Sequence, residues 1–117
     1  MEKTLSIEQK EAIQKKMAAL KKENPKLKKV LPIVVFGDED DEKELYVAYF
    51  RKPNFKEYSK WMSLMKKDEV SALKSLATDC FLAGDKELID DDNLFLFGSI
   101  SQLGTIMESR QAEIVNF

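Results

Sequence analysis

Histidine is absent from this sequence of 117 residues, and cysteine occurs once, at Cys80. Histidine is the usual general base near neutral pH and the commonest metal ligand, so its absence excludes Ser-His-Asp and Cys-His catalysis and every histidine-ligated zinc site. One cysteine can form neither an all-cysteine zinc site nor a disulfide within the chain. Catalysis would therefore have to rest on carboxylates, lysines or tyrosines alone. No cofactor is expected, and the single thiol suits a reducing cytoplasm.

Long apolar runs are absent as well. No run in the sequence approaches the roughly 20 residues of a membrane-spanning helix, and the first ten residues lack the apolar core of a signal peptide. With 44% hydrophobic and 34% charged residues, the composition is that of an ordinary globular domain. We expect a single domain over residues 1–117, without a membrane partner.

Positive charge is concentrated at the N-terminus. Residues 1–36 contain nine lysines and four glutamates, a balance of +5, whereas residues 37–117 contain ten basic and seventeen acidic residues, a balance of −7. A basic arm on an acidic body is typical of a solvated helix face attracted to that body, or of an arm that binds an anion. The alternative function is therefore a small nucleic-acid-binding regulator that uses the arm, residues 1–25, although the acidic body opposes phosphate binding.

The basic arm carries a helix-start signal. Ser6 and Gln9 fit a capping box and predict a helix from about residue 7 to residue 23. Pro25 ends this helix, because proline disfavours a helical residue before it. The helix has a thin apolar stripe at helical spacing, formed by Ile13, Met17 and Leu20.

Two short runs rich in β-branched and aromatic residues predict one antiparallel β-hairpin over residues 28–51. Its strands are residues 30–36 and 45–50, joined by a hydrophilic turn. Pro32 lacks an N–H group and predicts an edge strand or a bulged start. A lone hairpin is marginal in water, so it must pack on helices or on another chain, and it allows a homo-oligomer through strand pairing.

Residues 53–110 predict a three-helix bundle, which completes an α+β, mainly helical fold. Helices are expected after Pro53 to about residue 67, from 69 to 82, and from 93 to 110. Cys80 lies on the apolar face of the middle helix without a basic neighbour, and we expect a buried structural thiol. The apolar face of the last helix is formed by Leu94, Phe97, Ile100, Leu103, Gly104 and Met107.

An acidic segment, CFLAGDKELIDDDN, separates the last two helices. It fails the EF-hand pattern, because the glycine position counted from its first aspartate holds another aspartate. We interpret it as a connection in which Gly84 ends one helix in the left-handed conformation, Leu88 and Ile89 fill the gap, and one of three aspartates caps the next helix. Two alternatives stay open: a weakly bound Ca²⁺ ion, and a carboxylate-only metal-dependent enzyme. The aspartates concerned are Asp85, Asp90, Asp91 and Asp92.

A wide face of aromatic residues and methionines follows Pro53. Such a face is usually core, but adaptable Met and aromatic side chains also serve surfaces that hold varied partner helices. We hypothesise that the exposed part of this face contributes to a groove for a helical partner. The partner-binding residues are expected to be Tyr58, Trp61, Met62 and Met65.

A family resemblance is carried by the runs YVAYFRKPNFKEYSKWM and DCFLAGDKELIDDDNLFLFGSISQLGTIME. They resemble small tail assembly chaperones encoded by phages and prophages, over about residues 20–110. The shared order is a hairpin ending in an aromatic-Arg/Lys-x-Pro turn, a helix, a Cys-aromatic-x-x-Gly-Asp segment, and an acidic turn before the last helix. The matching positions are Tyr49, Phe50, Arg51, Pro53, Cys80, Phe81, Gly84, Asp85, Asp91 and Asp92.

This resemblance implies a non-enzymatic protein of the bacterial host cytoplasm. It implies a protein that binds the tape measure protein, or another helical protein, during virion morphogenesis. The chaperone would shield apolar helical stretches of that partner until tail-tube subunits polymerise around them. No catalytic residue and no metal ligand is implied.

Overall fold

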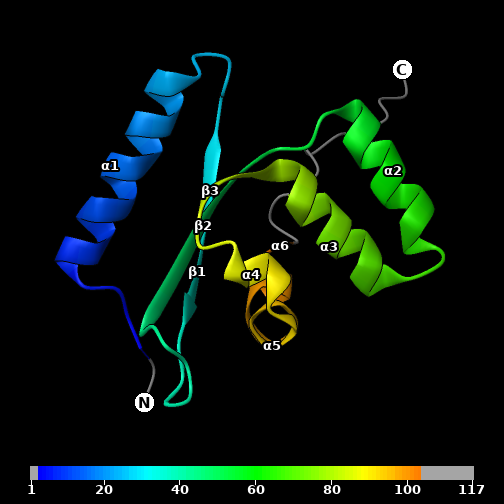
Figure 1. Cartoon of the computed structure of the whole chain (residues 1–117). Helices are drawn as coiled ribbons and strands as arrows, with labels where there is room; N and C mark the ends of the chain where they lie inside the picture. The colour runs from blue at the N-terminus through cyan, green and yellow to red at the C-terminus, as the bar shows by residue number, and fades with distance from the viewer. Residues whose placement is uncertain (1–2, 104–117) are drawn as a thin grey trace, which may run out of the picture.

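The computed structural model describes residues 3–103 and shows an α+β protein with a three-stranded antiparallel sheet (Figure 1). The predicted fold class is confirmed: an N-terminal helix, a hairpin and a helical C-terminal part. The part of the last helix expected beyond residue 103 lies outside the described residues, as do Gly104 and Met107. The elements in chain order are α1 (Ile7–Glu23), β1 (Val30–Phe36), β2 (Leu45–Arg51), α2 (Phe55–Met65), α3 (Glu69–Cys80), β3 (Phe81–Gly84), α4 (Glu87–Asp90), α5 (Asp92–Leu94), the π-helical η1 (Phe95–Ser99) and α6 (Ile100–Leu103).

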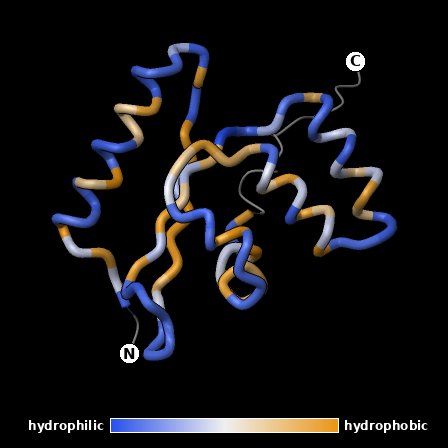
Figure 2. The backbone as a smooth tube through the Cα atoms, viewed as in Figure 1, coloured by the Kyte–Doolittle hydropathy of each residue, from blue (hydrophilic) through white to orange (hydrophobic). Residues whose placement is uncertain are grey.

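The first helix begins and packs as predicted. The Gln9 N–H donates to the Ser6 hydroxyl at 3.1 Å, and the Ser6 N–H donates to the Gln9 side chain at 2.8 Å, which completes the capping box. Ile13 and Leu20 are buried and Met17 is partly buried. A mostly hydrophilic α1 therefore lies against the more hydrophobic hairpin through one narrow stripe (Figure 2).

The two faces of the sheet belong to two separate cores, because side chains alternate along each strand. On β2, Tyr46, Ala48 and Phe50 join the main core with α3, α4 and η1. Val47 and Tyr49 face the other way, into the smaller core under α1. The sheet consequently lies between α1 on one side and the C-terminal helices on the other.

The third strand corrects the prediction of a helix that continues to Leu82. The helix ends at Cys80, and residues 81–84 pair antiparallel with β2, with a register shift between Tyr49 and Phe50. The Phe81 ring packs edge-on against the Phe50 ring, with centroids 5.9 Å apart. The free backbone edge of β2 and this aromatic contact outweigh the local helical preference.

The last helical segment also departs from its predicted face. The Ile100 N–H donates to the Phe95 carbonyl, five residues earlier, and this π-helical turn shifts the side chains that follow relative to a 3.6-residue repeat. Phe97, expected in the core, is 84% exposed, while Phe95 is buried. The buried Ser99 hydroxyl donates to the Leu88 carbonyl at 2.7 Å and fixes this arrangement. The predicted bundle is therefore a helix pair, α2 and α3, and a separate α5–η1–α6 segment.

Candidate docking surface

Helix α2 starts from a second capping box. The Glu57 N–H donates to the Asn54 side chain at 2.9 Å, and the Asn54 N–H donates back to the Glu57 carboxylate at 2.9 Å. Pro53 precedes the cap, where its missing N–H costs the helix no bond. The sequence therefore fixes the first turn of α2 close to the end of β2.

A charged clamp holds this turn in place. Arg51, the last residue of β2, donates two hydrogen bonds of 2.6 Å to the Glu57 carboxylate and one of 2.8 Å to the Asp79 carbonyl at the end of α3. The Arg51 side chain is 28% exposed and that of Glu57 15%. The hydrogen bond from Arg51, helped by the Asn54 backbone, lowers the pKa of Glu57 despite its burial, and the same bond raises the pKa of Arg51. The strand, α2 and α3 are thus joined at one point.

The four residues predicted to bind a partner are divided by the structure. Trp61 packs against the main core, and its buried indole N–H has no hydrogen-bond acceptor among the described residues. The Tyr58 ring lies against the Trp61 ring with centroids 5.6 Å apart. Tyr58 and Met65 are partly buried, whereas Met62 is 50% exposed. Trp61 is therefore mainly an anchor for α2, and Met62 faces solvent.

A further residue of this surface is Phe55, the first residue of α2, which is 87% exposed. Phe55 precedes Met62 by seven residues, so both lie on the same side of the helix two turns apart. Val70, at the start of α3, is a third exposed apolar residue, at 41%. The heptad spacing of Phe55 and Met62 is visible in the sequence, but it does not show which side of α2 is open to solvent.

Four lysines lie on α2 or directly after it. Lys60 pairs with Asp79 at 3.3 Å. Within residues 3–103, Lys56, Lys66 and Lys67 have no ion pair, and all three are exposed. The apolar surface of α2 is thus bordered by positive charge.

The acidic segment after β3 is structural. Asp85 extends the sheet: its N–H donates to the Val47 carbonyl at 2.8 Å, and its carboxylate accepts from the Val47 N–H at 3.0 Å and from Lys43 at 2.6 Å. Asp91 caps α5 by accepting from the N–H groups of Asn93 and Leu94, as predicted for one of the three aspartates. Over the range 3–103, no three acidic or cysteine side chains are grouped so that they could hold a metal ion.

The other residues of this segment occupy defined places. Leu88 and Ile89 are buried and fill the gap between helices, as predicted. Asp92 accepts from Lys74 at 2.8 Å, and this bond lowers the pKa of Asp92. Gly84 has the expected positive φ of 103°, but it ends β3 rather than a helix, because the helix already ends at Cys80.

Cys80 is fully buried, in agreement with the sequence prediction. Burial, followed by the negative charge of Glu57, raises the pKa of the Cys80 thiol to about 12. A thiol of this kind stays protonated and unreactive at neutral pH. Cys80 is therefore a packing residue below the clamp.

The comparisons with known proteins give a family and a fold. Residues 20–105 match a family described as a domain of unknown function (DUF6848). The chain belongs to this family. The DUF6848 match begins in the last turn of α1 and includes the whole sheet, the Arg51–Glu57 clamp and α2.

One solved structure is similar in fold to this DUF6848 chain. It is that of an uncharacterised protein, rbstp2171, from Bacillus stearothermophilus, with a TM-score of 0.54 and 19% sequence identity. The superposition covers 85% of this chain and 98% of the other one. At this identity the likeness shows the fold alone, and no curated protein matches the chain.

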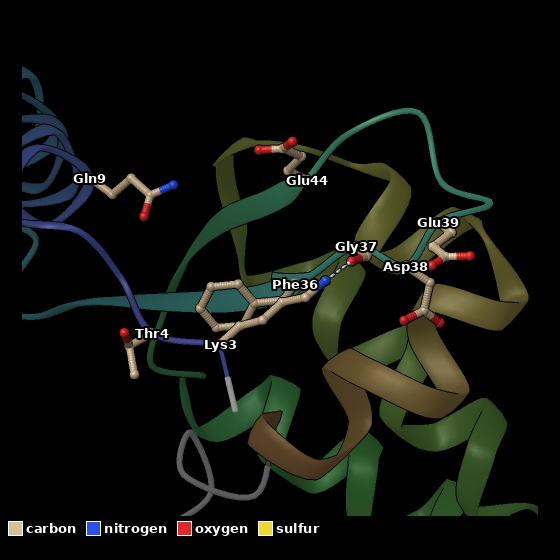
Figure 3. Close-up of a pocket in the computed structure, with 8 residues that line it drawn as sticks. All are labelled: Lys3, Thr4, Gln9, Phe36, Gly37, Asp38, Glu39 and Glu44. Atoms are coloured by element: carbon tan, nitrogen blue, oxygen red, sulfur yellow. Dashed lines mark hydrogen bonds between the residues drawn. The ribbon is translucent and has the colours of Figure 1, made fainter. Parts of the chain in front are cut away.

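Four cavities in the described part of the DUF6848 chain are open to solvent rather than enclosed. A cavity of about 480 Å³ lies at the turn end of the hairpin, between the β1–β2 turn and the first described residues (Figure 3). Lys3 reaches across this cavity and donates to the Gly37 carbonyl, opposite the acidic residues Asp38, Glu39 and Glu44. Within residues 3–103, no helix is both long and apolar enough to span a membrane.

Proposed function

We propose that this chain is a phage or prophage tail assembly chaperone that binds and shields the tape measure protein in the bacterial host cytoplasm. One observation carries the proposal: α2 contains six large apolar or aromatic residues, yet none of its eleven residues, all of them described, is buried. The six residues are Phe55, Tyr58, Trp61, Met62, Leu64 and Met65. The motif resemblance supplies the identity of the partner, and α2 supplies a surface for it.

The exposure of α2 favours a helical, apolar partner. An exposed apolar surface costs free energy in water and commonly marks an interaction site. Phe55 and Met62 give one large rigid ring and one adaptable side chain on the same side of the helix. An amphipathic helix of a partner could place its apolar face against them, as in helix-in-groove recognition.

The lysines near α2 indicate which charged residues should flank the apolar stripe of such a partner helix. Lys56, Lys66 and Lys67 carry positive charges without partners among the described residues. Electrostatic complementarity then favours a partner whose apolar stripe is flanked by Asp and Glu. Because these charges lie at the rim, they affect the association rate and the salt dependence more than the final affinity.

A tagged pull-down from the native host, with phage genes expressed, tests the proposal. The full chain is used as bait at low and at high salt, and bound proteins are identified by mass spectrometry. We expect the tape measure protein at both salt concentrations, because apolar packing dominates. Phe55→Ser combined with Met62→Ser should abolish its recovery.

Ile7→Ser is the matched control. Ile7 is an apolar residue whose exposed fraction, 75%, lies between those of Met62 and Phe55, but it belongs to α1. This variant should recover as much tape measure protein as the wild type. Equal recovery by the α2 double variant, with its circular dichroism spectrum unchanged, would show that α2 is not the docking surface.

One observation favours the alternative, a regulator that binds nucleic acid. Lys26, Lys28, Lys29 and Lys52 line an open cavity of about 270 Å³ at the end of the sheet, next to α1 with its own exposed lysines. Phosphate binding weakens steeply with salt, because counterions are released on binding. Fluorescence anisotropy with labelled DNA and RNA at low and high salt therefore distinguishes the two functions.

A further inference from the structure

The strand β1 has a free edge. Among the described residues its one neighbour in the sheet is β2. The Gly37 N–H donates to the Glu44 carbonyl at 2.9 Å, and antiparallel bonds alternate along a strand, so the odd-numbered residues of β1 bond to β2. The even-numbered ones point their backbone groups away from it, and no hydrogen bond within residues 3–103 reaches them; three of them are partly exposed, whereas Val30 is 1% exposed and covered in the single chain. These residues are Val30, Pro32, Val34 and Phe36.

This edge is apolar and only partly covered. The strand VLPIVVF contains no charged residue, and five of its seven side chains are partly rather than fully buried. Beside its end lies Phe97, 84% exposed, which lines a small cavity with Val35, Phe36 and Gly98. A Cβ atom at Gly98 would lie 2.7 Å from the Val35 side chain, so the backbone of η1 packs directly on β1. Phe97 thus adds an exposed ring next to an open strand.

The two ends of β1 carry opposite charge. Lys28 and Lys29 precede the strand, and Asp38 and Glu39 follow it. All four side chains are exposed, and none has an ion pair within residues 3–103. A strand that begins positive and ends negative is complementary to a second copy of itself in the antiparallel direction, whereas a parallel arrangement would place like charges together.

We propose that β1 pairs with β1 of a second copy, antiparallel and around a two-fold axis, to join two sheets into one. In the register that places Ile33 opposite Ile33, Phe36 lies opposite Val30 of the second copy, and Val34 lies opposite its Pro32. The Val34 N–H donates to the Pro32 carbonyl, and Phe36 exchanges two hydrogen bonds with Val30 once the groups that cover Val30 in the single chain move aside. Directly opposite residues share a face, so both cores continue across the junction.

Pro32 is compatible with this pairing. Proline at an edge normally opposes strand addition, since it cannot donate to the ladder. In this register each Pro32 removes a single donor, opposite Val34, while the remaining bonds at the strand ends are kept. The same register places Lys28 opposite Asp38 of the second copy, so the charges at both ends of the junction attract.

The oligomeric state of the full chain tests the proposal. Sedimentation equilibrium should give twice the 13.5 kDa mass of the chain, with a concentration-dependent dissociation. The variant Lys28→Glu with Lys29→Glu, and the variant Asp38→Lys with Glu39→Lys, should each raise the dimer dissociation constant about tenfold or more. The four substitutions together should restore dimerisation, as should an equimolar mixture of the two variants.

A matched control separates pairing from net charge. The variant Lys15→Glu with Lys16→Glu makes the same charge change as Lys28→Glu with Lys29→Glu, but at two exposed positions of α1. It should leave the dimer dissociation constant unchanged. The circular dichroism spectra should be alike for all variants, because the substituted side chains are exposed and none has an ion pair within residues 3–103. A monomer at all concentrations, which would also result if another segment of the chain covered β1, overturns the proposal. So does a dimer that the end-charge variants leave unchanged or that their combination fails to restore.

Discussion

Arg51 and Glu57 form a bidentate ion pair, with both guanidinium–carboxylate bonds at 2.6 Å. This pair joins the last residue of the central strand to the first turn of α2, and a third Arg51 bond reaches the end of α3. One guanidinium group therefore fixes the start of α2, while Trp61 anchors the helix on the main core further along. Because α2 carries the proposed docking residues, the clamp links the fold to the proposed function.

Loss of the clamp should destabilise the domain. Arg51→Met leaves the Glu57 carboxylate largely buried without its partner, and we expect the free energy of unfolding to fall by about 2–3 kcal/mol. Arg51→Lys keeps the charge but loses the planar fork, so about half of that loss is expected. Urea denaturation measures both, with Lys52→Ala as the exposed neighbouring control. A loss of stability no greater for Arg51→Met than for Lys52→Ala would contradict the role assigned to the clamp.

The clamp should also make stability depend on pH. The hydrogen bond from Arg51 holds the pKa of Glu57 below its ordinary value of 4.5. A lowered carboxyl pKa stabilises the folded state above pH 4.5, and this contribution is lost as the pH falls through the folded pKa. Glu57→Gln should therefore show a shallower loss of unfolding free energy than the wild type between about pH 5 and pH 3. Parallel curves for the two proteins would show that Glu57 has no such shift; Asp68 and Asp92, whose pKa values are also lowered, keep some slope in both.

Trp61 and Met62 are adjacent in the sequence, but substitution of Trp61 should mainly reduce stability and substitution of Met62 should mainly reduce partner binding. Trp61 packs on the main core, so Trp61→Ala should lower the free energy of unfolding by about 2–4 kcal/mol. Met62 is 50% exposed, so Met62→Ala should change it by less than about 0.5 kcal/mol. Partner binding per folded molecule should instead fall with Met62→Ala. If Met62→Ala proved the more destabilising of the two, the assignment of faces on α2 would be wrong.

Cys80 should be inert until the protein unfolds. It is fully buried, and its pKa is raised to about 12, so the reactive thiolate is scarce. We expect a thiol reagent such as DTNB to react with the native protein only at the rate of unfolding. Ser63→Cys adds a thiol at an exposed position of α2 and should react at once under the same conditions. Fast labelling of native wild-type protein would contradict the buried position of Cys80.

Short sequence signals correctly predicted the elements that neighbouring residues alone determine. The Ser6–Gln9 capping box and the β-branched hairpin strands each depend on a short stretch of sequence, and the structure has both where they were expected. The strand at residues 81–84 was missed because its cause is distant: it forms on the free edge of β2, more than thirty residues earlier in the chain. A helical pattern that runs into Phe81 and Leu82 gives no sign of that edge.

The same distinction applies to the candidate surface. The exposure of Phe97 follows from a π-helical turn that the buried Ser99–Leu88 bond and the close approach of Gly98 to β1 stabilise. The predicted aromatic and Met face of α2 was present in the sequence, but its division into a partly buried Trp61 and an exposed Met62 depends on where α3 lies. Phe55 was missed as a candidate docking residue for the same reason.

Co-expression with the tape measure protein tests the central claim most directly. The quantity measured is the soluble fraction of the tape measure protein, with the wild-type chain, with the Phe55→Ser and Met62→Ser double variant, with Ile7→Ser, and with no chain at all. The account predicts a soluble partner with the wild type and Ile7→Ser, and an aggregated one with the double variant and without the chain. A soluble fraction that is the same in all four cases, or that the double variant preserves in full, would contradict it.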